Sequence, residues 1–191
     1  SLLIFCSDHG EMLGDHAMAY KWLMYEPIVH VPLIVRHPGS INEPSEVTDM
    51  VSLMDIGPTV LETAGVPIPS YFEGRSLMPY LRQGVLRPHR YVFCEDNYQV
   101  MMRSETHKLV YYAGQDQGEL YDLVQDPGEL WNLWQDAAYG GVKNKMLRDL
   151  LDWMAGSVYW NAGYKRTRAR QTRMRWPARG DVNLHGPANI E

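Results

Sequence analysis

A polar stretch directly after an apolar run constrains this chain more than any other feature. Residues 2–6 read Leu-Leu-Ile-Phe-Cys, and residues 7–16 read Ser-Asp-His-Gly-Glu-Met-Leu-Gly-Asp-His. An unbroken apolar run of this kind is typical of a strand buried on both faces of a parallel sheet. The polar residues therefore follow the carboxyl end of a predicted strand, which is where α/β sheets bind their ligands.

The first part of the chain, residues 1–88, has the pattern of the edge of a large mixed or parallel α/β sheet. A second apolar run at 31–36 predicts another buried strand, and apolar residues at helical spacing predict helices at 49–64 and 77–81. A strand buried on both faces needs neighbours, and few other parallel-type strands follow in the sequence. We therefore expect residues 1–191 to be the C-terminal part of a longer chain.

Residues 89–160 predict a separate small subdomain. Four short strand-like runs start near residues 90, 98, 108 and 119, and the short gaps between them predict an antiparallel sheet. An apolar stripe at 146–154 predicts one long helix, which we expect to cover this sheet and to end at Gly156. The remaining residues, 161–191, predict an extended basic tail.

The composition excludes some classes of protein. The formal net charge of -5 argues against nucleic-acid binding by the chain as a whole. No apolar run approaches the roughly 18 residues of a membrane-spanning helix. The two cysteines, Cys6 and Cys94, lie in apolar runs, so we expect buried free thiols rather than a disulfide framework.

Asp8 and His9 are candidate metal ligands. The carboxylate suits Ca²⁺, Mg²⁺ or Mn²⁺, whereas the imidazole favours Mn²⁺ or a later transition metal. The alternative interpretation is a capping aspartate beside a solvated loop histidine. Two ligands do not complete a metal site, and no second carboxylate cluster stands out in the sequence. We therefore expect the other ligands to come from outside these residues.

Lys21 is the candidate anion-binding residue. Beside a divalent metal, a lysine stabilises the anionic oxygens of a sulfate or phosphate group. Without such a neighbour, a lone lysine is an ordinary surface residue. His16 is a weaker candidate, either as an acid–base group or as a polar neighbour of the same edge.

The order of these motifs resembles the later half of the sulfatase family, within the alkaline-phosphatase-like superfamily. The resemblance covers roughly residues 2–134, and the ordered series is far more specific than any single motif. The matching stretches are 7–10, 13–16, Lys21, 25–26, 31–34, 38–39, 55–59, 64–65, 74–77, 108–109, 119–123, 126–129 and 132–133.

The resemblance implies specific roles for these residues. Asp8 and His9 match the family's last pair of metal ligands, and Lys21 matches the lysine that grips the sulfate or phosphate oxygens. It implies one divalent ion, Ca²⁺ in the first place, with Mn²⁺ and Mg²⁺ as alternatives. Tyr121 and the turn at 126–129 match a structural signature of the small sheet rather than catalytic residues. Family members hydrolyse sulfate esters with a formylglycine made from Cys or Ser in a Cys/Ser-x-Pro/Ala-x-Arg motif.

The sequence departs from the family pattern at the nucleophile. Neither Cys6 nor Cys94 lies in such a motif, so we expect the formylglycine, its arginine and the first Asp pair upstream of Ser1. The predicted activity is that of a sulfuric ester hydrolase when the upstream polypeptide is present, with the chain alone inactive. A phosphonate monoester hydrolase or phosphodiesterase of the same superfamily is one alternative. A non-catalytic binding or assembly module is another.

The tail carries a concentration of positive charge. Its basic residues are Lys165, Arg166, Arg168, Arg170, Arg173, Arg175 and Arg179, with Trp176 among them. A nucleic acid or a membrane surface would be attracted by this charge. We expect instead a tail that packs on its own domain or joins copies of the chain in a homo-oligomer. A third interpretation places one or two arginines at the mouth of the active site, where they attract an anionic substrate.

Overall fold

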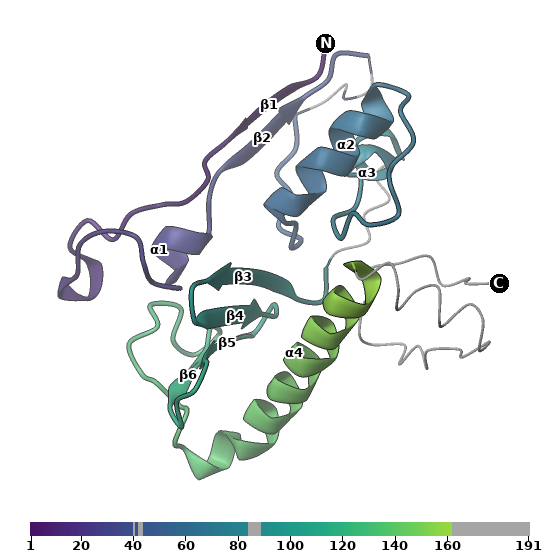
Figure 1. Ribbon diagram of the computed structural model, residues 1–191. Coiled ribbons are helices and arrows are strands. Elements are labelled where there is room, and N and C mark those ends of the chain that lie inside the picture. The colour runs from purple at the N-terminus through teal and green to yellow at the C-terminus, as the bar shows by residue number, and fades with distance from the viewer. Residues whose placement is uncertain (40, 42–43, 84–88, 162–191) are drawn as a thin grey trace, which may run out of the picture. The chain divides into compact units, whose positions relative to one another are not determined.

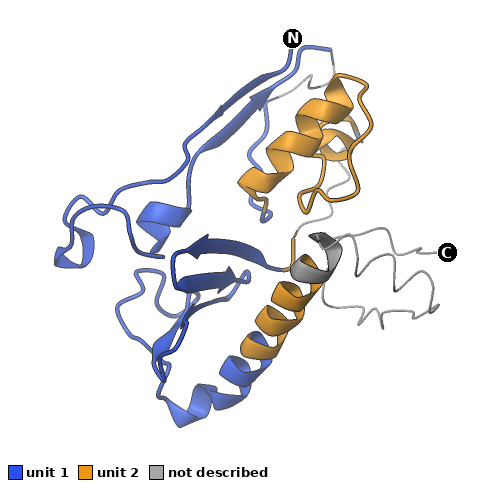
Figure 2. Cartoon of the chain, in the orientation of Figure 1, with its two compact units in different colours: residues 1–50, 91–146 blue, residues 51–90, 147–191 orange. Residues whose placement is uncertain are grey.

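The computed structural model describes residues 1–39, 41, 44–83 and 89–161 (Figure 1). Its elements are β1 (Leu3–Cys6), η1 (Asp15–Ala17), α1 (Glu26–Val29), β2 (Leu33–Arg36), η2 (Leu53–Asp55), α2 (Ile56–Thr63), α3 (Met78–Gln83), β3 (Val92–Asp96), β4 (Gln99–Arg103), β5 (His107–Tyr112), β6 (Gly118–Asp122), η3 (Ala137–Tyr139) and α4 (Gly140–Asn161), where η marks a 3₁₀ turn. The chain divides into two compact units, residues 1–50 with 91–146 and residues 51–90 with 147–191 (Figure 2). The predicted mixture of strands and helices is confirmed. Of the predicted tail at 161–191, Asn161 ends α4 and residues 162–191 lie outside the described residues.

Strands β3 to β6 form a four-stranded antiparallel sheet in sequence order, which confirms the predicted hairpins. The register places Met101 opposite Val110 and Arg103 opposite Lys108. Because side chains alternate between the two faces of a strand, these four residues share one face, the Lys108 face. Leu120 is fully buried on the opposite face.

The chain segment that leads into α1 packs on the Lys108 face. Met24 is buried in one apolar cluster with Met101 and Val110. On the opposite face the ring of Trp134 lies so close to Gly118 that a side chain at that position would collide with it. The early segment and the small sheet therefore form a single packed unit.

Strand β1 is not the buried parallel strand that its apolar sequence predicts. It pairs antiparallel with β2, with Phe5 opposite Ile34. Phe5 is 61% and Ile34 62% exposed, and β2 alternates half-buried with exposed side chains, so the predicted burial of both strands is wrong for the described residues. Both cysteines are free as predicted, but Cys6 is exposed and Cys94 half-buried. An apolar run encodes a strand, whereas its burial and its neighbour's direction depend on other parts of the protein.

The helices differ from the prediction mainly at their ends. Ser52 and Asp55 form a capping box at η2, so the helical stretch predicted from residue 49 begins several residues later. Gly65, with φ of +70°, follows α2 as predicted. Helix α4 passes Gly156, because one glycine costs only about 1 kcal/mol in a helix interior. Among the described residues, no helix is both long and apolar enough to cross a membrane.

Asp55 is a buried charge in the second unit. Its carboxylate is fully buried and accepts hydrogen bonds from the amide N–H of Arg75 at 2.7 Å and of Ser52 at 2.9 Å. The Nε2 atom of His89 lies 2.8 Å from Oδ2. Burial alone would raise the pKa of Asp55, but His89 and the two amides hold this pKa below its usual 3.8.

Asp55→Asn should lower the free energy of unfolding at pH 7 by about 2 kcal/mol, since it leaves buried donors without a charged acceptor. Because the pKa of Asp55 is lower in the folded state, the carboxylate stabilises the fold above about pH 4. This contribution is lost as the pH falls through the folded-state pKa. The stability difference between the two proteins, measured by urea denaturation, should therefore shrink from pH 7 to pH 3. A difference that is the same at both pH values would show that the charge is not its cause.

Candidate functional site

Asp8 and His9 lie where the chain leaves β1. The backbone N–H of His9 donates to Asp8 Oδ1 at 3.0 Å. Gly10, the next residue, approaches the carbonyl oxygen of Pro27 so closely that a side chain there would collide with it. Its own N–H donates to the carbonyl oxygen of Ile28 at 2.8 Å. These contacts fix the Asp-His pair beside the helix α1.

The ring of His9 has one nitrogen fixed and the other turned toward charged groups. Nδ1 lies 2.7 Å from the carbonyl oxygen of Gly10, and it must carry the hydrogen because that oxygen can only accept. Nε2 therefore presents a lone pair. It lies 2.7 Å from Lys21 Nζ, which donates to it, and 3.5 Å from Asp8 Oδ2. The structure thus brings Asp8, His9 and Lys21 together as one group, the strand-end cluster.

The strand-end cluster has the donor chemistry of a cation site. The backbone N–H of His9 lowers the pKa of Asp8 below its usual 3.8, and the charge of Lys21 adds to this effect. An ionised carboxylate oxygen and an imidazole lone pair, 3.5 Å apart, can serve as neighbouring ligands of one divalent ion. Asp8 and His9 therefore fit the metal that the sequence predicts. Over the described ranges no group of three or more His, Cys, Asp or Glu residues forms a complete ligand set.

His16, the weaker candidate, lies in the turn between Gly14 and Met18. It has a φ of +52° in the turn η1, and its ring stacks on Tyr25 with 4.1 Å between ring centroids. It lines a pocket of about 500 Å³ together with His30 and Glu129. Its weaker candidacy as an acid–base group stays a prediction.

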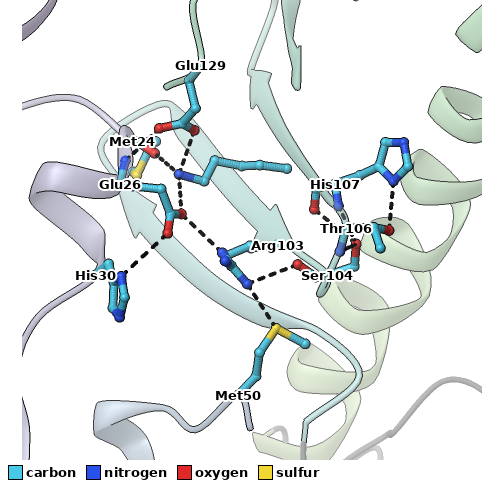
Figure 3. Close-up of polar contacts among 10 residues, drawn as sticks. Met24, Glu26, His30, Met50, Arg103, Ser104, Thr106, His107 and Glu129 are labelled. Atoms are coloured by element: carbon cyan, nitrogen blue, oxygen red, sulfur yellow. Dashed lines mark hydrogen bonds and ion pairs between the residues drawn. The ribbon is translucent and has the colours of Figure 1, made fainter. Parts of the chain in front are cut away.

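A second cluster of charged residues packs against the segment that follows Lys21. The sequence did not predict this cluster. Lys108 is fully buried, and its Nζ lies 2.6 Å from Glu26 Oε1, 2.7 Å from Glu129 Oε1 and 3.0 Å from the carbonyl oxygen of Met24 (Figure 3). Glu129 Oε2 accepts the backbone N–H of Glu26 at 2.7 Å. Arg103 Nε donates to Glu26 Oε1 at 3.0 Å. We call Lys108, Arg103, Glu26 and Glu129 the buried ion cluster.

The two carboxylates of the buried ion cluster differ in their electrostatics. Burial would raise the pKa of Glu26, but Lys108 and Arg103 outweigh this and hold the pKa below its usual 4.5. Burial dominates at Glu129 and raises its pKa. Lys108 and the backbone N–H of Glu26 offset this rise only in part, and the negative charge of Glu26 adds to it.

One sequence signal could have indicated this cluster. Lys108 directly precedes the buried residues Leu109 and Val110 in a strand, and the alternation places it on the same face as Val110. A lysine on a packed face is almost never buried without a charged partner. The partners themselves, Glu26 and Glu129, could not be identified because they lie far from Lys108 in the sequence.

The fold belongs to the alkaline-phosphatase-like class, a mixed α/β architecture in which a small antiparallel sheet is followed by a long helix. Residues 14–155 match the family model described as N-sulphoglucosamine sulphohydrolase, C-terminal. The chain therefore belongs to the sulfatase family, of which it represents a C-terminal portion. This confirms the resemblance drawn from the sequence motifs.

The similar proteins include sulfatases and a phosphonate monoester hydrolase. Human arylsulfatase K is 41% identical over 90 residues, which are 47% of this chain and 17% of that protein. The solved structure of BT4656 in complex with its substrate D-glucosamine-2-N,6-O-disulfate is 29% identical, with a TM-score of 0.68 over 84% of this chain and 35% of that one. The phosphonate monoester hydrolase of Agrobacterium radiobacter is 32% identical, with a TM-score of 0.72 over 82% of this chain and 35% of that one. The chain thus spans only a fraction of each relative's length.

Proposed function

We propose that this chain supplies part of the metal site and the anion-gripping lysine of a sulfuric ester hydrolase. The observation that carries the proposal is the strand-end cluster, in which His9 Nε2 lies 2.7 Å from Lys21 Nζ and 3.5 Å from Asp8 Oδ2. Membership of the sulfatase family supports a sulfate ester as the substrate. The sulfated sugar bound by BT4656 supports a sulfated saccharide as its class.

In the proposed site, Asp8 and His9 hold one divalent ion, Ca²⁺ by family resemblance or else Mn²⁺ or Mg²⁺. When bound, such an ion polarises a sulfate oxygen and stabilises negative charge on it. Lys21 donates from its ammonium to another anionic oxygen of the same group. The hydrogen bond from His9 Nδ1 to the Gly10 carbonyl leaves the lone pair on Nε2. Lys21 Nζ donates to this lone pair in the structure and would have to release it for His9 to bind the ion. His16 remains a weaker acid–base candidate beside the pocket.

The attacking group is proposed to be a formylglycine in the polypeptide upstream of Ser1. The remaining metal ligands are proposed to come from that same part of the polypeptide. The partners of this chain are then an anionic ester and the rest of the same polypeptide. Hydrolysis of the sulfate ester requires both parts, because the strand-end cluster binds charge but contains no nucleophile.

The sulfate assignment is tested against its closest alternative with the complete enzyme. Initial rates on p-nitrophenyl sulfate should exceed those on p-nitrophenyl phosphate diesters. A negligible sulfate rate with a large diester rate would instead assign a phosphonate monoester hydrolase or phosphodiesterase. The similarity to the Agrobacterium radiobacter enzyme is the observation that favours this alternative.

Residues 1–191 alone should not hydrolyse an aryl sulfate, since neither Cys6 nor Cys94 lies in a formylglycine motif. The measurement is release of p-nitrophenol from p-nitrophenyl sulfate at high protein concentration, with and without added Ca²⁺. Lys21→Ala in the same 191 residues is the matched control. Turnover above that control would show that the chain holds its own nucleophile.

A further inference from the structure

The residues that directly follow Lys21 are fastened to the small sheet at alternate positions. The carbonyl oxygen of Trp22 accepts from Gln99 Nε2 at 3.1 Å. Two residues on, the carbonyl oxygen of Met24 accepts from Lys108 Nζ at 3.0 Å. A further two residues on, the backbone N–H of Glu26 donates to Glu129, and its carboxylate contacts Lys108 and Arg103 (Figure 3).

We propose that the buried ion cluster positions Lys21, so that Lys108 and Glu129 are positioning residues of the strand-end cluster. The inference rests on the proposed role of Lys21 as the anion-binding residue. Lys21 itself is half-buried and carries a flexible four-carbon stem. The place of its ammonium therefore depends on how firmly the backbone beside it is held.

The geometry of Lys108 suits this role. Its ammonium has three N–H groups, and it faces three oxygens, from Met24, Glu26 and Glu129, at 2.6 to 3.0 Å. Two of these oxygens belong to the segment 22–26, and the third belongs to a residue that also accepts the backbone N–H of Glu26. A single buried cation therefore links the strand β5 to two points of the segment.

The cost of this arrangement indicates a role beyond stability. Buried ion pairs contribute little net stability compared with well-packed apolar residues of the same volume, whereas they specify one geometry. Glu129 also has a φ of +56°, a backbone conformation that glycine adopts more easily than glutamate. Both the buried charges and the unfavourable backbone conformation of Glu129 thus occur where the segment after Lys21 is held.

The test measures the chemical reactivity of Lys21 in the intact protein after chelation of divalent ions. An amine-acylating reagent is applied for short times, and the peptide containing Lys21 is quantified by mass spectrometry against the peptides of Lys143 and Lys145 in α4. Lys108→Met removes the central cation. Glu129→Gly removes the carboxylate while suiting the positive φ. Leu120→Ala, on the opposite face of the same sheet, is the control for general loosening.

Lys21 should be acylated about fivefold faster in both cluster variants, the change expected from the loss of one ordinary hydrogen bond, and at the native rate in Leu120→Ala. Unchanged labelling in the folded cluster variants, or an equal rise in Leu120→Ala, would overturn the proposal. Where a variant does not fold, amide hydrogen exchange of Glu26 in the unmutated protein decides. Slow exchange of the Glu26 amide supports the proposal that the buried ion cluster holds this segment. Exchange at the rate of an open loop refutes it. Labelling needs no turnover, so failure of the sulfatase assignment and failure of this inference give separate results.

Discussion

Replacing Lys21 with alanine in the complete enzyme should lower kcat/KM for a sulfate ester by about 10²–10³-fold. A preorganised donor aimed at charge that develops in the transition state contributes on this scale. Lys21 Nζ, 2.7 Å from His9 Nε2, lies beside the proposed cation site and is proposed to be such a donor. The measurement is steady-state hydrolysis of p-nitrophenyl sulfate by the purified enzyme, with circular dichroism to verify folding.

Lys145→Ala is the matched control, because it removes a lysine from α4 rather than from the strand-end cluster. Its kcat/KM should equal that of the unmutated enzyme. Asp8→Ala should lower the bound metal content as well as turnover. If Lys21→Ala and Asp8→Ala both leave turnover and metal content unchanged, the chain is a non-catalytic binding or assembly module instead.

Lys108→Met should lower the free energy of unfolding by about 3–5 kcal/mol at pH 7, the cost of removing one partner from a buried ion pair. Glu129 would be left buried without its cation, and the half-buried Glu26 would keep only Arg103. Since the pKa of Glu26 is lowered in the folded state, its ionised form stabilises the fold above about pH 4.5 and less as the pH falls. The effect of Lys108→Met, measured by chemical denaturation, should therefore be smaller at pH 3 than at pH 7.

Leu120→Ala separates charge from packing in this experiment. It should cost about 2–5 kcal/mol by opening a cavity on the opposite face of the sheet. That loss should be independent of pH, since no titratable group is involved. A Lys108→Met effect below about 1 kcal/mol, or one that does not change with pH, would contradict the importance of the buried charges.

The strand-end cluster could be predicted because its signals are local. Asp8 and His9 follow a recognisable apolar run, and Lys21 lies only twelve residues after His9. The order of short motifs around them was enough to indicate the sulfatase family. The small antiparallel sheet was predictable for the same reason, since each of its hairpins joins neighbouring runs with a short turn.

The features that sequence reasoning missed depend on distant residues. Lys108 is visible in the sequence as a charge in an apolar strand, but its partner Glu26 lies on another element, and residues 27–107 separate the two in the sequence. The burial of Phe5 in β1 was predicted wrongly because burial is a property of the surroundings rather than of the run itself. Helix α4 was predicted to end at Gly156, but it continues to Asn161. Here a single glycine, which is a local signal, destabilises the helix too little to end it.

The long-range ties of the segment after Lys21 have a consequence for how the protein is made. Met24 and Lys108 are separated by 84 positions, and Glu26 and Glu129 by 103. At a synthesis rate of about 5–20 residues per second, Glu129 leaves the ribosome roughly 5–20 seconds after Glu26. During that interval the nascent segment has none of these partners, so the backbone beside Lys21 acquires its final course late in synthesis. The proposed anion-binding edge is therefore encoded early in this chain and assembled only after the small sheet has been translated.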